Sequence, residues 1–551
     1  MSHGEYMGKV VIIGLDGAPF GLIQKWAEEG VLPNLKKLIG GGAFGPLMSS
    51  YLPETPIAWT SIVTGKNAGK HGVYDWGERA EGSYDIGVTL SHSCKEPPLW
   101  KIIGEEGKKV GIFNVPLTYP PRPLNGFLVS GFDTPSTKVC FTYPDSLSDE
   151  IRSRIKDYVL AEREVYTRGN EKRYVDDILY VLEKKEAAAL YLIDRYEVDF
   201  SLYVFMEIDH LHHKLWRLLE EGSEEERRLF QKVYQRMDET VGKIVNRFDE
   251  ETTFILVSDH GAGPLEGIMF INKWLMEEGW LKLKRRPSFY LKLFLSRTDL
   301  FVKGYRLLCK FGLGRLGKLL PTSLQYDLAT SFISFGDIDW AQTKAYAFGK
   351  YGQIFINLKG REPQGIVAPG EEYEQLLKEI SKRLLKLVHP KTGEKMVREV
   401  LRKGELYQGP MLKKAPDLSF VIRDFRYDSS VQFGLGVKGI FGVPVFEDSG
   451  THRREGILIA SGRGIKSGFK IEGATLVDIA PLALYFLNLP IPEDMDGKVL
   501  VTTLKEDWMK SHPIRHKKKE SKNASSETKG ELSPEEMEMV KKRLRSLGYL
   551  D

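Results

Sequence analysis

Short runs of apolar residues, rich in Val and Ile, alternate along the chain with segments that have the apolar spacing of a helix. Because these runs have no polar face, they are typical of central strands that are buried on both sides of a parallel sheet. The clearest candidates are residues 10–15, 109–114, 126–131, 200–208, 253–258 and 456–460. Amphipathic segments at 174–195 and 224–248 each lead into one of these runs. This alternation predicts a doubly wound α/β protein, with a mostly parallel sheet and helices on both faces.

Two stretches depart from this alternation. Residues 266–344 are dense in Lys, Arg, Leu, Phe and Tyr, with several helical patterns and no convincing strand. The run from Lys517 to Lys522 has almost no apolar side chain to bury, whereas Ser533-Pro534-Glu535-Glu536 is a capping box that starts a helix. The predicted division is therefore a first part of the α/β core at 1–265, a mainly helical insertion or cap at 266–344, a second part of the core at 345–507, and a basic flexible linker with a C-terminal helix at 508–551.

Charge and cysteine content exclude several classes of protein. The 79 Lys and Arg residues exceed the 75 Asp and Glu residues by only four, too few for the basic face that stable nucleic-acid binding needs. No run approaches the roughly 20 apolar residues of a membrane helix, and the residues after Met1 lack a signal-peptide pattern. Cys94, Cys140 and Cys309 lie too far apart to suggest a disulfide framework or a cysteine zinc site. We expect a cytoplasmic protein with no membrane association and no stable nucleic-acid partner; the sequence does not determine its oligomeric state.

Acidic and imidazole side chains follow three of the predicted strands where each strand ends. These residues are Asp16 after the first strand, Asp209-His210-Leu211-His212-His213 after 200–208, and Asp259-His260 after 253–258. Ligands of open α/β sheets bind outside the carboxyl ends of the strands, so these side chains should meet at one rim. Buried carboxylates need a positive partner, and no Lys or Arg is their sequence neighbour.

A bound cation is the simplest such partner. Asp209 and His213, four residues apart, can lie on one face of a helical turn and share one metal ion. Mixed carboxylate and imidazole ligands suit Zn²⁺ or, less strongly, Mn²⁺. Any one of these pairs alone fits an N-cap Asp and an ordinary histidine, and it is their repetition at three strand ends that favours a divalent-cation site.

A hydroxyl side chain, Thr55, precedes Pro56 and a helix-like run. At the N-cap, which we predict for Thr55, backbone N–H groups and the helix dipole favour an anion. A metal-bound Thr hydroxyl there can act as a nucleophile, although taken alone a plain N-cap Thr is the better interpretation. The rival hydroxyls of Thr60, Ser61 and Thr64 fall inside the helix and should face neighbouring turns.

Taken together and in order, these segments resemble the alkaline phosphatase superfamily, and most closely its type I phosphodiesterase/nucleotide pyrophosphatase branch. The segments that carry the resemblance are Ile13-Gly14-Leu15-Asp16-Gly17, Thr55 with Ser61-Ile62-Val63-Thr64-Gly65 and His71-Gly72, Asp209-His210-Leu211-His212-His213, Ser258-Asp259-His260-Gly261, Gly450-Thr451-His452, Leu476-Val477-Asp478-Ile479-Ala480-Pro481, and Pro492-Glu493-Asp494-Met495-Asp496-Gly497. Each is short, but their number and order over about residues 10 to 500 make the resemblance specific.

The resemblance implies an alkaline-phosphatase-like fold and a metal-dependent phosphoric ester hydrolase with two divalent metal ions, Zn²⁺ or Mn²⁺. One ion would be held by Asp209, His213 and His452, and the other by Asp16, Asp259, His260 and the Thr55 oxygen. Thr55 would be the nucleophile and would form a phospho-threonine intermediate. The remaining histidines of these motifs, His71, His210 and His212, would be structural or would support the ligands.

The chain departs from the family pattern at one point. Nucleotide pyrophosphatases usually carry, in the helix after the nucleophile, an Asn that binds a non-bridging phosphate oxygen, and no Asn lies between Pro56 and Lys66. Either another part of the chain makes this contact or the substrate differs. Residues 72–77 are candidates for shaping the pocket of the substrate's organic group, with Tyr74 and Trp76 as stacking surfaces, but both aromatic side chains also fit the core.

We expect a small-molecule phosphate ester substrate, with phosphodiesterase/nucleotide pyrophosphatase activity as the first hypothesis. A phosphomonoesterase or phosphomutase on the same fold is the alternative. A sulfatase would need Cys or Ser in place of Thr55, followed by x-Pro-x-Arg, and this sequence has neither. A non-catalytic binding protein with a degenerate site would bind no metal.

Overall fold

The computed structural model describes residues 8–284, 335–434, 437–444, 448–518 and 532–547. Most of the predicted helical insertion (285–334) and of the predicted basic linker (519–531) lies outside the described residues. The insertion and the flexible linker therefore stay predictions.

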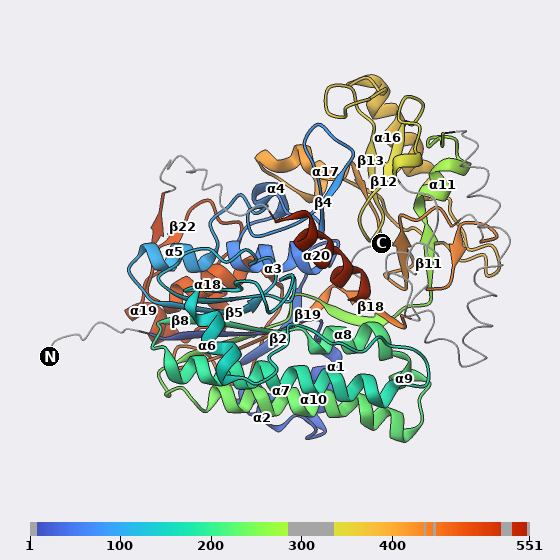
Figure 1. Ribbon diagram of the computed structural model, residues 1–551. Coiled ribbons are helices and arrows are strands. Elements are labelled where there is room, and N and C mark those ends of the chain that lie inside the picture. The colour runs from blue at the N-terminus through green and yellow to red at the C-terminus, as the bar shows by residue number, and fades with distance from the viewer. Residues whose placement is uncertain (1–7, 285–334, 435–436, 445–447, 519–531, 548–551) are drawn as a thin grey trace.

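A ten-stranded sheet forms the centre of the molecule, in the order β20-β2-β19-β9-β1-β8-β5-β6-β7, with β21 also paired to β2 (Figure 1). The bounds of its strands are β1 Val10–Leu15, β2 Ala43–Met48, β5 Val110–Val115, β6 Gly126–Ser130, β7 Thr142–Tyr143, β8 Phe200–Phe205, β9 Thr253–Val257, β19 Glu455–Ser461, β20 Phe469–Lys470 and β21 Ala474–Thr475. The middle strands, from β9 to β6, are all parallel, and every residue of β1, β5, β8 and β9 is buried. The predicted fold class, with a mostly parallel sheet and buried central strands, is thus confirmed, although β19, the predicted strand 456–460, pairs antiparallel with both of its neighbours.

Helices cover both faces of this sheet, and the alternation of side chains along β1 shows how. Val10 and Ile12 belong to a hydrophobic cluster with the helices of one face, whereas Val11, Ile13 and Leu15 belong to the cluster of the other. The first face carries α3 Thr55–Thr64, α5 Leu99–Glu105 and α18 Ile479–Phe486. The second carries α1 Phe20–Glu28, α2 Pro33–Gly41, α6 Ser146–Arg154, α7 Glu171–Arg195 and α10 Glu224–Val245.

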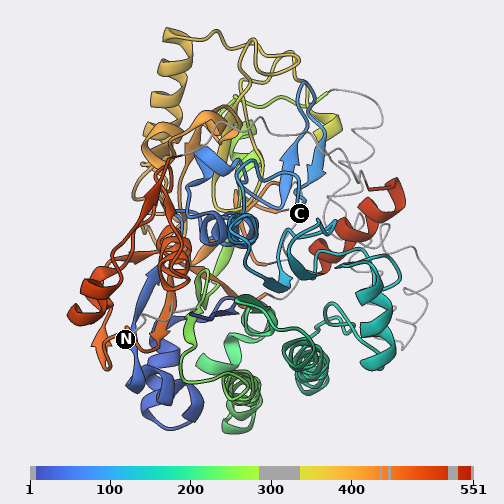
Figure 2. The same ribbon diagram turned by 90° about the vertical axis from the view of Figure 1, so that its left-hand side faces the viewer.

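The described residues between 267 and 444 contribute smaller sheets with a hydrophobic core of their own. One sheet has the order β12-β13-β15-β14, and the other β16-β11-β17. The bounds are β11 Gly267–Phe270, α11 Ile271–Glu277, β12 Ala345–Ala347, β13 Gln353–Ile356, α16 Glu371–Leu384, β14 Leu401–Arg402, α17 Lys403–Leu406, β15 Leu418–Ser419, β16 Tyr427–Ser430 and β17 Phe441–Gly442. In both views this part, light green to orange, lies above the central sheet, on the side away from helices α7 and α10 (Figures 1 and 2). The strand β11 lies where the sequence showed no convincing strand.

The remaining elements are short connections and the C-terminal helix. They are α4 Ala68–His71, β3 Gly77–Arg79, β4 Ile86–Val88, α8 Glu207–Leu215, α9 Arg217–Glu220, β10 Gly261–Pro264, β18 Gly450–Arg453, β22 Ile491–Pro492, α19 Glu506–Ser511, β23 His516–Lys517 and α20 Pro534–Leu547. The capping box predicted for α20 is present, with Glu536 N donating to Ser533 Oγ and Ser533 N to Glu536 Oε2. Val540 and Leu544 are buried in the main hydrophobic cluster, so this helix packs against the core. Among the described residues, no helix combines the length and apolar character needed to cross a bilayer.

Candidate metal centre and active site

The register of the central strands brings the predicted acids together at one rim. Leu15 pairs with Phe205 and Gly14 with Val257, so β1, β8 and β9 end side by side. Strand β8 ends at Phe205, earlier than predicted, and Asp209 lies in the first turn of α8 rather than directly after the strand. The chain turns into a helix there, and this helix places Asp209 and His213 one turn apart, as their spacing predicted.

His452 reaches the same rim from a distant part of the sequence. Strand β18 pairs antiparallel with β10, and Ala262 lies opposite His452. The pairing stacks the His452 ring on the ring of His260, with centroids 3.6 Å apart. No local sequence signal places His452 here, because the contact depends on the pairing of two short strands far apart in the chain.

Asp209, His213 and His452 form one side of the cluster. His213 Nε2 lies 3.4 Å from Asp209 Oδ2, and His452 Nε2 lies 3.5 Å from Asp209 Oδ1. The two Nε2 atoms of these histidines are 3.0 Å apart. All three side chains are buried.

Asp16, Asp259, His260 and Thr55 form the other side. His260 Nε2 lies 3.4 Å from each of Asp16 Oδ1, Asp259 Oδ2 and Thr55 Oγ1. These four side chains are also buried. In each of two sets of three side chains, the ligand atoms all lie within 4.8 Å of one another. The sets are Asp209, His260 and His452, and Asp16, Asp259 and His260, so His260 belongs to both sides. The structure therefore brings all seven predicted site residues together.

Hydrogen bonds to main-chain carbonyls fix the tautomers of two histidines. A carbonyl oxygen can only accept, so His452 Nδ1 donates to Pro53 O at 2.7 Å, and His260 Nδ1 donates to Gly261 O at 3.0 Å. In the neutral ring, each Nε2 then carries a lone pair directed at the acids. Burial, with His260 adding to its effect, lowers the pKa of His452 well below its ordinary value. This is the arrangement that a metal-binding imidazole requires.

The carboxylates of the cluster are crowded. Burial raises the pKa of Asp16 well above its ordinary value, with Asp259 and Asp209 adding to the rise, and burial raises the pKa of Asp259 to about 6. Burial alone would raise the pKa of Asp209 too, but the imidazoles of His213 and His452 outweigh it and the pKa is lowered. Asp16 Oδ1 and Asp259 Oδ2 are buried and accept no hydrogen bond from any described residue. Such oxygens, facing imidazole lone pairs, fit divalent cations that would offset the cost of burying the acids.

Thr55 is the first residue of α3 rather than its N-cap. Glu54, with extended backbone angles, occupies the N-cap, so the prediction for Thr55 was wrong by one position. The hydroxyls of Thr60, Ser61 and Thr64 donate back to carbonyls one turn earlier, as predicted. Thr55 is thus the hydroxyl of α3 that faces the acids and imidazoles.

Comparison with known proteins decides the family. The sequence matches the type I phosphodiesterase / nucleotide pyrophosphatase family over residues 10–310, more than half of the chain. The chain belongs to this family. Its members hydrolyse phosphate esters in a metal-dependent reaction, so this protein is a phosphoric ester hydrolase, and the resemblance to the alkaline phosphatase superfamily is confirmed. No curated protein matches the sequence significantly.

Two solved structures illustrate the shared fold. Murine ectonucleotide pyrophosphatase / phosphodiesterase 5 aligns with 90% of this chain and 100% of its own, at 12% identity and a TM-score of 0.50. Phosphonoacetate hydrolase from Sinorhizobium meliloti 1021 aligns over 87% of this chain and 96% of its own, at 12% identity and a TM-score of 0.51. At this identity the similarity shows the fold, which is the alkaline-phosphatase-like fold that the sequence implied.

Three further histidines of this phosphodiesterase-family protein, His71, His210 and His212, have partners outside the cluster. His210 Nδ1 lies 2.7 Å from Glu162 Oε2, and His212 Nε2 lies 2.7 Å from the Tyr234 hydroxyl. His71, at the end of α4, contacts the Ser61 hydroxyl at 3.2 Å. These contacts agree with the supporting or structural roles expected for the three residues.

Several residues at the site were not found from the sequence. Trp59 Nε1 donates to Asp16 Oδ2 at 2.6 Å, and the same indole lies so close to Gly14 that a Cβ there would meet Trp59 Cη2 at 2.2 Å. The spacing of Thr55 and Trp59, one turn apart, was an available signal. Tyr351 comes from the β12–β13 loop and its hydroxyl accepts a hydrogen bond from His452 N at 3.2 Å, and no local pattern marks it.

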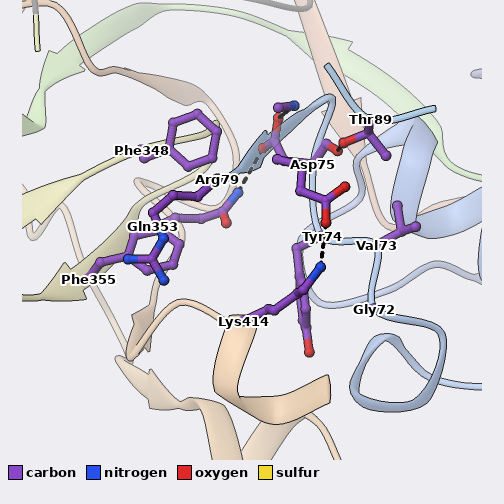
Figure 3. A pocket seen from close by; sticks show the side chains of 12 residues that line it. Gly72, Val73, Tyr74, Asp75, Arg79, Thr89, Phe348, Gln353, Phe355 and Lys414 are labelled. Carbon is purple, nitrogen blue, oxygen red and sulfur yellow. Dashed lines mark hydrogen bonds and ion pairs between the residues drawn. The ribbon is translucent and has the colours of Figure 1, made fainter. Parts of the chain in front are cut away.

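A pocket lies between residues 72–79 and β13 (Figure 3). Tyr74, Phe348 and Phe355 line it, and the Gln353 amide donates to Asp75 Oδ2 at 2.9 Å. The cavity measures about 40 Å³, which is room for a few water molecules rather than for an organic group. Trp76 is fully buried in the main core, so of the two aromatic side chains proposed for the pocket only Tyr74 lines it.

Proposed function

We propose that the protein is a phosphodiesterase of the nucleotide pyrophosphatase type, which acts through a covalent phospho-threonine intermediate at a two-metal site. One observation carries the proposal: the Thr55 hydroxyl, at the start of α3, lies 3.4 Å from His260 Nε2, and the five other acidic and imidazole side chains of the cluster are buried around them.

Asp209, His213 and His452 would hold one ion, and Asp16, Asp259, His260 and Thr55 the other. The mixed carboxylate and imidazole donors favour Zn²⁺, with Mn²⁺ as the second choice. When bound, such ions acidify a hydroxyl or a water molecule and neutralise the charge of the phosphoryl oxygens.

The first step is an in-line displacement at phosphorus. Thr55 Oγ1 forms a bond to phosphorus while the bond to the leaving oxygen breaks, and that oxygen takes up a proton to leave as an alcohol. The amino end of α3 carries the positive end of the helix dipole, which favours the anionic group held at Thr55. Trp59 holds Asp16 in place, and the Pro53 carbonyl holds the ring of His452.

The second step releases the product. A water oxygen bonds to phosphorus, the bond from Thr55 to phosphorus breaks, and the water's proton returns to the threonine oxygen. The net reaction converts a diester and water into a monoester and an alcohol.

Rapid-quench mass spectrometry with a bis-nitrophenyl phosphodiester tests the intermediate. We expect the nitrophenyl phosphoryl group on the peptide that contains Thr55, and no adduct in Thr55→Ala, whose turnover should fall at least about 10³-fold with its metals retained. Thr55→Ser, which keeps a hydroxyl, is the matched control and should still form the adduct. Wild-type-like turnover by Thr55→Ala would contradict the proposal, and comparison with the nitrophenyl monoester measures the alternative phosphomonoesterase activity.

A further inference from the structure

Helix α8 carries ionisable side chains besides the metal-site ligands Asp209 and His213, among them Glu207 and His210. These two are three residues apart, so they share a face of the helix that adjoins the face of the ligands. Every residue of α8 is buried, and its polar side chains therefore depend on partners within the protein. The partners of Glu207 and His210 thus decide how one flank of α8 is held.

Both side chains contact an ionisable group from another segment. The Nζ of Lys185, in α7, lies 2.8 Å from Glu207 Oε1, and both side chains are 0% exposed. The Oε2 of Glu162, between α6 and α7, lies 2.7 Å from His210 Nδ1, with at most 2% of either side chain exposed. An ionised carboxylate only accepts, so His210 Nδ1 donates to Glu162. This flank of α8 is thus tied to α7 and to the segment before it.

The other flank of α8 faces α10 (Figure 1). His212 Nε2 lies 2.7 Å from the hydroxyl of Tyr234, which belongs to α10. At about 100° per residue, His210 and His212 project to opposite sides of the face that carries the two ligands. A rotation of α8 about its axis would turn both ligands away from the rest of the cluster, and the contacts on the two flanks oppose such a rotation.

The ion pair between Lys185 and Glu207 lies where apolar side chains would serve stability as well. Leu182 of α7 and Leu211 of α8 belong to the hydrophobic cluster of this face of the sheet. Taking two charges out of water costs free energy that their attraction does not always return, and apolar side chains of similar volume are often equally or more stabilising. A charged pair also fixes the direction in which its partners meet. The pair therefore indicates a need for one defined orientation of α8.

We propose that Lys185 and Glu162 are positioning residues that fix the rotation of α8, and with it the direction of both metal-site ligands on this helix. The inference rests on the proposed function, because it needs the metal ion that Asp209, His213 and His452 would hold. Both residues act through side chains of α8 rather than as ligands. The other ion, whose proposed ligands follow β1 and β9 and begin α3, should not depend on them.

Zinc titration of the full-length protein tests this role without a chemical step. The double variant Lys185→Met/Glu207→Met replaces both charges by apolar side chains. In chelator-treated protein we expect it to unfold at the same urea concentration as wild type or at a higher one, because a buried ion pair is removed as a whole. Competition with a chelator of known affinity should show one of the two Zn²⁺ ions bound at least about tenfold more weakly, and the other unchanged.

The contact between Glu162 and His210 gives a second, independent comparison, which also decides the matter if the double variant does not fold. In Glu162→Gln the side-chain carbonyl still accepts from His210 Nδ1, so zinc affinity should stay within about threefold of wild type, whereas Glu162→Leu should weaken one ion about tenfold. Anomalous diffraction at limiting Zn²⁺ identifies the weakened ion, which we expect between Asp209, His213 and His452.

Glu186→Leu is the matched control. Glu186 follows Lys185 on α7 and is also buried, but its carboxylate pairs with Arg236 at 2.5 Å and Lys243 at 2.9 Å, both on α10. Its replacement should lower the melting temperature and leave the affinity for both ions unchanged. Wild-type-like affinity for both ions in the double variant and in Glu162→Leu, or an equal loss at both ions, would overturn the inference.

Zinc binding also separates this inference from the reaction mechanism. A wild-type protein that binds no zinc would overturn the proposed two-metal site and this inference together. A wild-type protein that binds two ions but forms no phospho-threonine would overturn the covalent mechanism alone, because zinc binding does not need Thr55 to react.

Discussion

Two regions of the molecule bury carboxylates in opposite ways. In the sheet formed by β12, β13, β15 and β14, Asp417 directly precedes β15 and is fully buried. It accepts two hydrogen bonds from Arg361 and one each from Lys403 and Tyr373. Burial alone would raise the pKa of Asp417, but Arg361 and Lys403 outweigh the burial and hold the pKa at about 2.

At the rim of the central sheet, no Lys or Arg among the described residues pairs with Asp16 or Asp259. Asp16 is equally buried, one of its oxygens accepts no hydrogen bond from any described residue, and its pKa is raised. A buried carboxylate that is paired with Lys or Arg side chains of the same protein stabilises the fold. A buried carboxylate that faces imidazoles and other acids is suited to bind metal ions from solution. This contrast distinguishes buried carboxylates that stabilise the fold from buried carboxylates that bind metal, and substitutions in each region can test it.

The largest effect should come from Asp16→Asn. We expect kcat/KM to fall at least about 10³-fold, because a ligand of one metal is lost. In chelator-treated protein the same substitution should not lower the melting temperature, since it removes a buried charge that has too few partners. Activity within tenfold of wild type, or a large loss of stability in the metal-free variant, would contradict the metal-binding role of Asp16 that distinguishes the rim from the Asp417 region.

The opposite outcome is expected for Arg361→Met. Removing one partner of a buried ion pair leaves Asp417 undercompensated, so the free energy of unfolding should fall by about 3–5 kcal/mol. Metal content and the kcat of the folded fraction should not change. Urea denaturation and elemental analysis measure both, and a variant that loses metals without losing stability would argue against a structural role for this region.

A smaller effect on metal binding is expected for Trp59→Phe, which removes the donor to Asp16 Oδ2. Loss of a hydrogen bond that orients a ligand typically weakens metal affinity about 10- to 100-fold. Competition with a chelator of known affinity measures this change. Trp76→Phe is the control, because Trp76 lies in the same hydrophobic cluster and packs on Phe132. Equal effects of the two substitutions would show that packing, and not the hydrogen bond, is responsible.

The smallest effect concerns the dependence of stability on pH. The folded pKa of Asp417, about 2, is below the ordinary value of 3.8, so its contribution is fully present above about pH 4 and is lost as pH falls toward 2. The size of this contribution is about 2 kcal/mol. Unfolding free energies measured between pH 5 and pH 2 should fall more steeply for wild type than for Asp417→Asn. Parallel curves would contradict the lowered pKa.

The difference between the two regions also explains what the sequence could predict. The rim acids follow buried apolar strands, so the strand pattern alone places Asp16 and Asp259 at the carboxyl edge. The boundaries were less accurate, because β8 ends at Phe205 and Thr55 begins α3 instead of capping it. His452 and Tyr351 could not be placed from local patterns, since their positions depend on strand pairing and on a loop held by tertiary contacts.

Anomalous diffraction from crystals grown with Zn²⁺ tests the central claim most directly. We predict two peaks at the rim of the central sheet, one bounded by Asp209, His213 and His452 and the other by Asp16, Asp259 and His260, with the Thr55 oxygen facing the second. Strong zinc peaks elsewhere in the molecule and none at this rim would contradict the account.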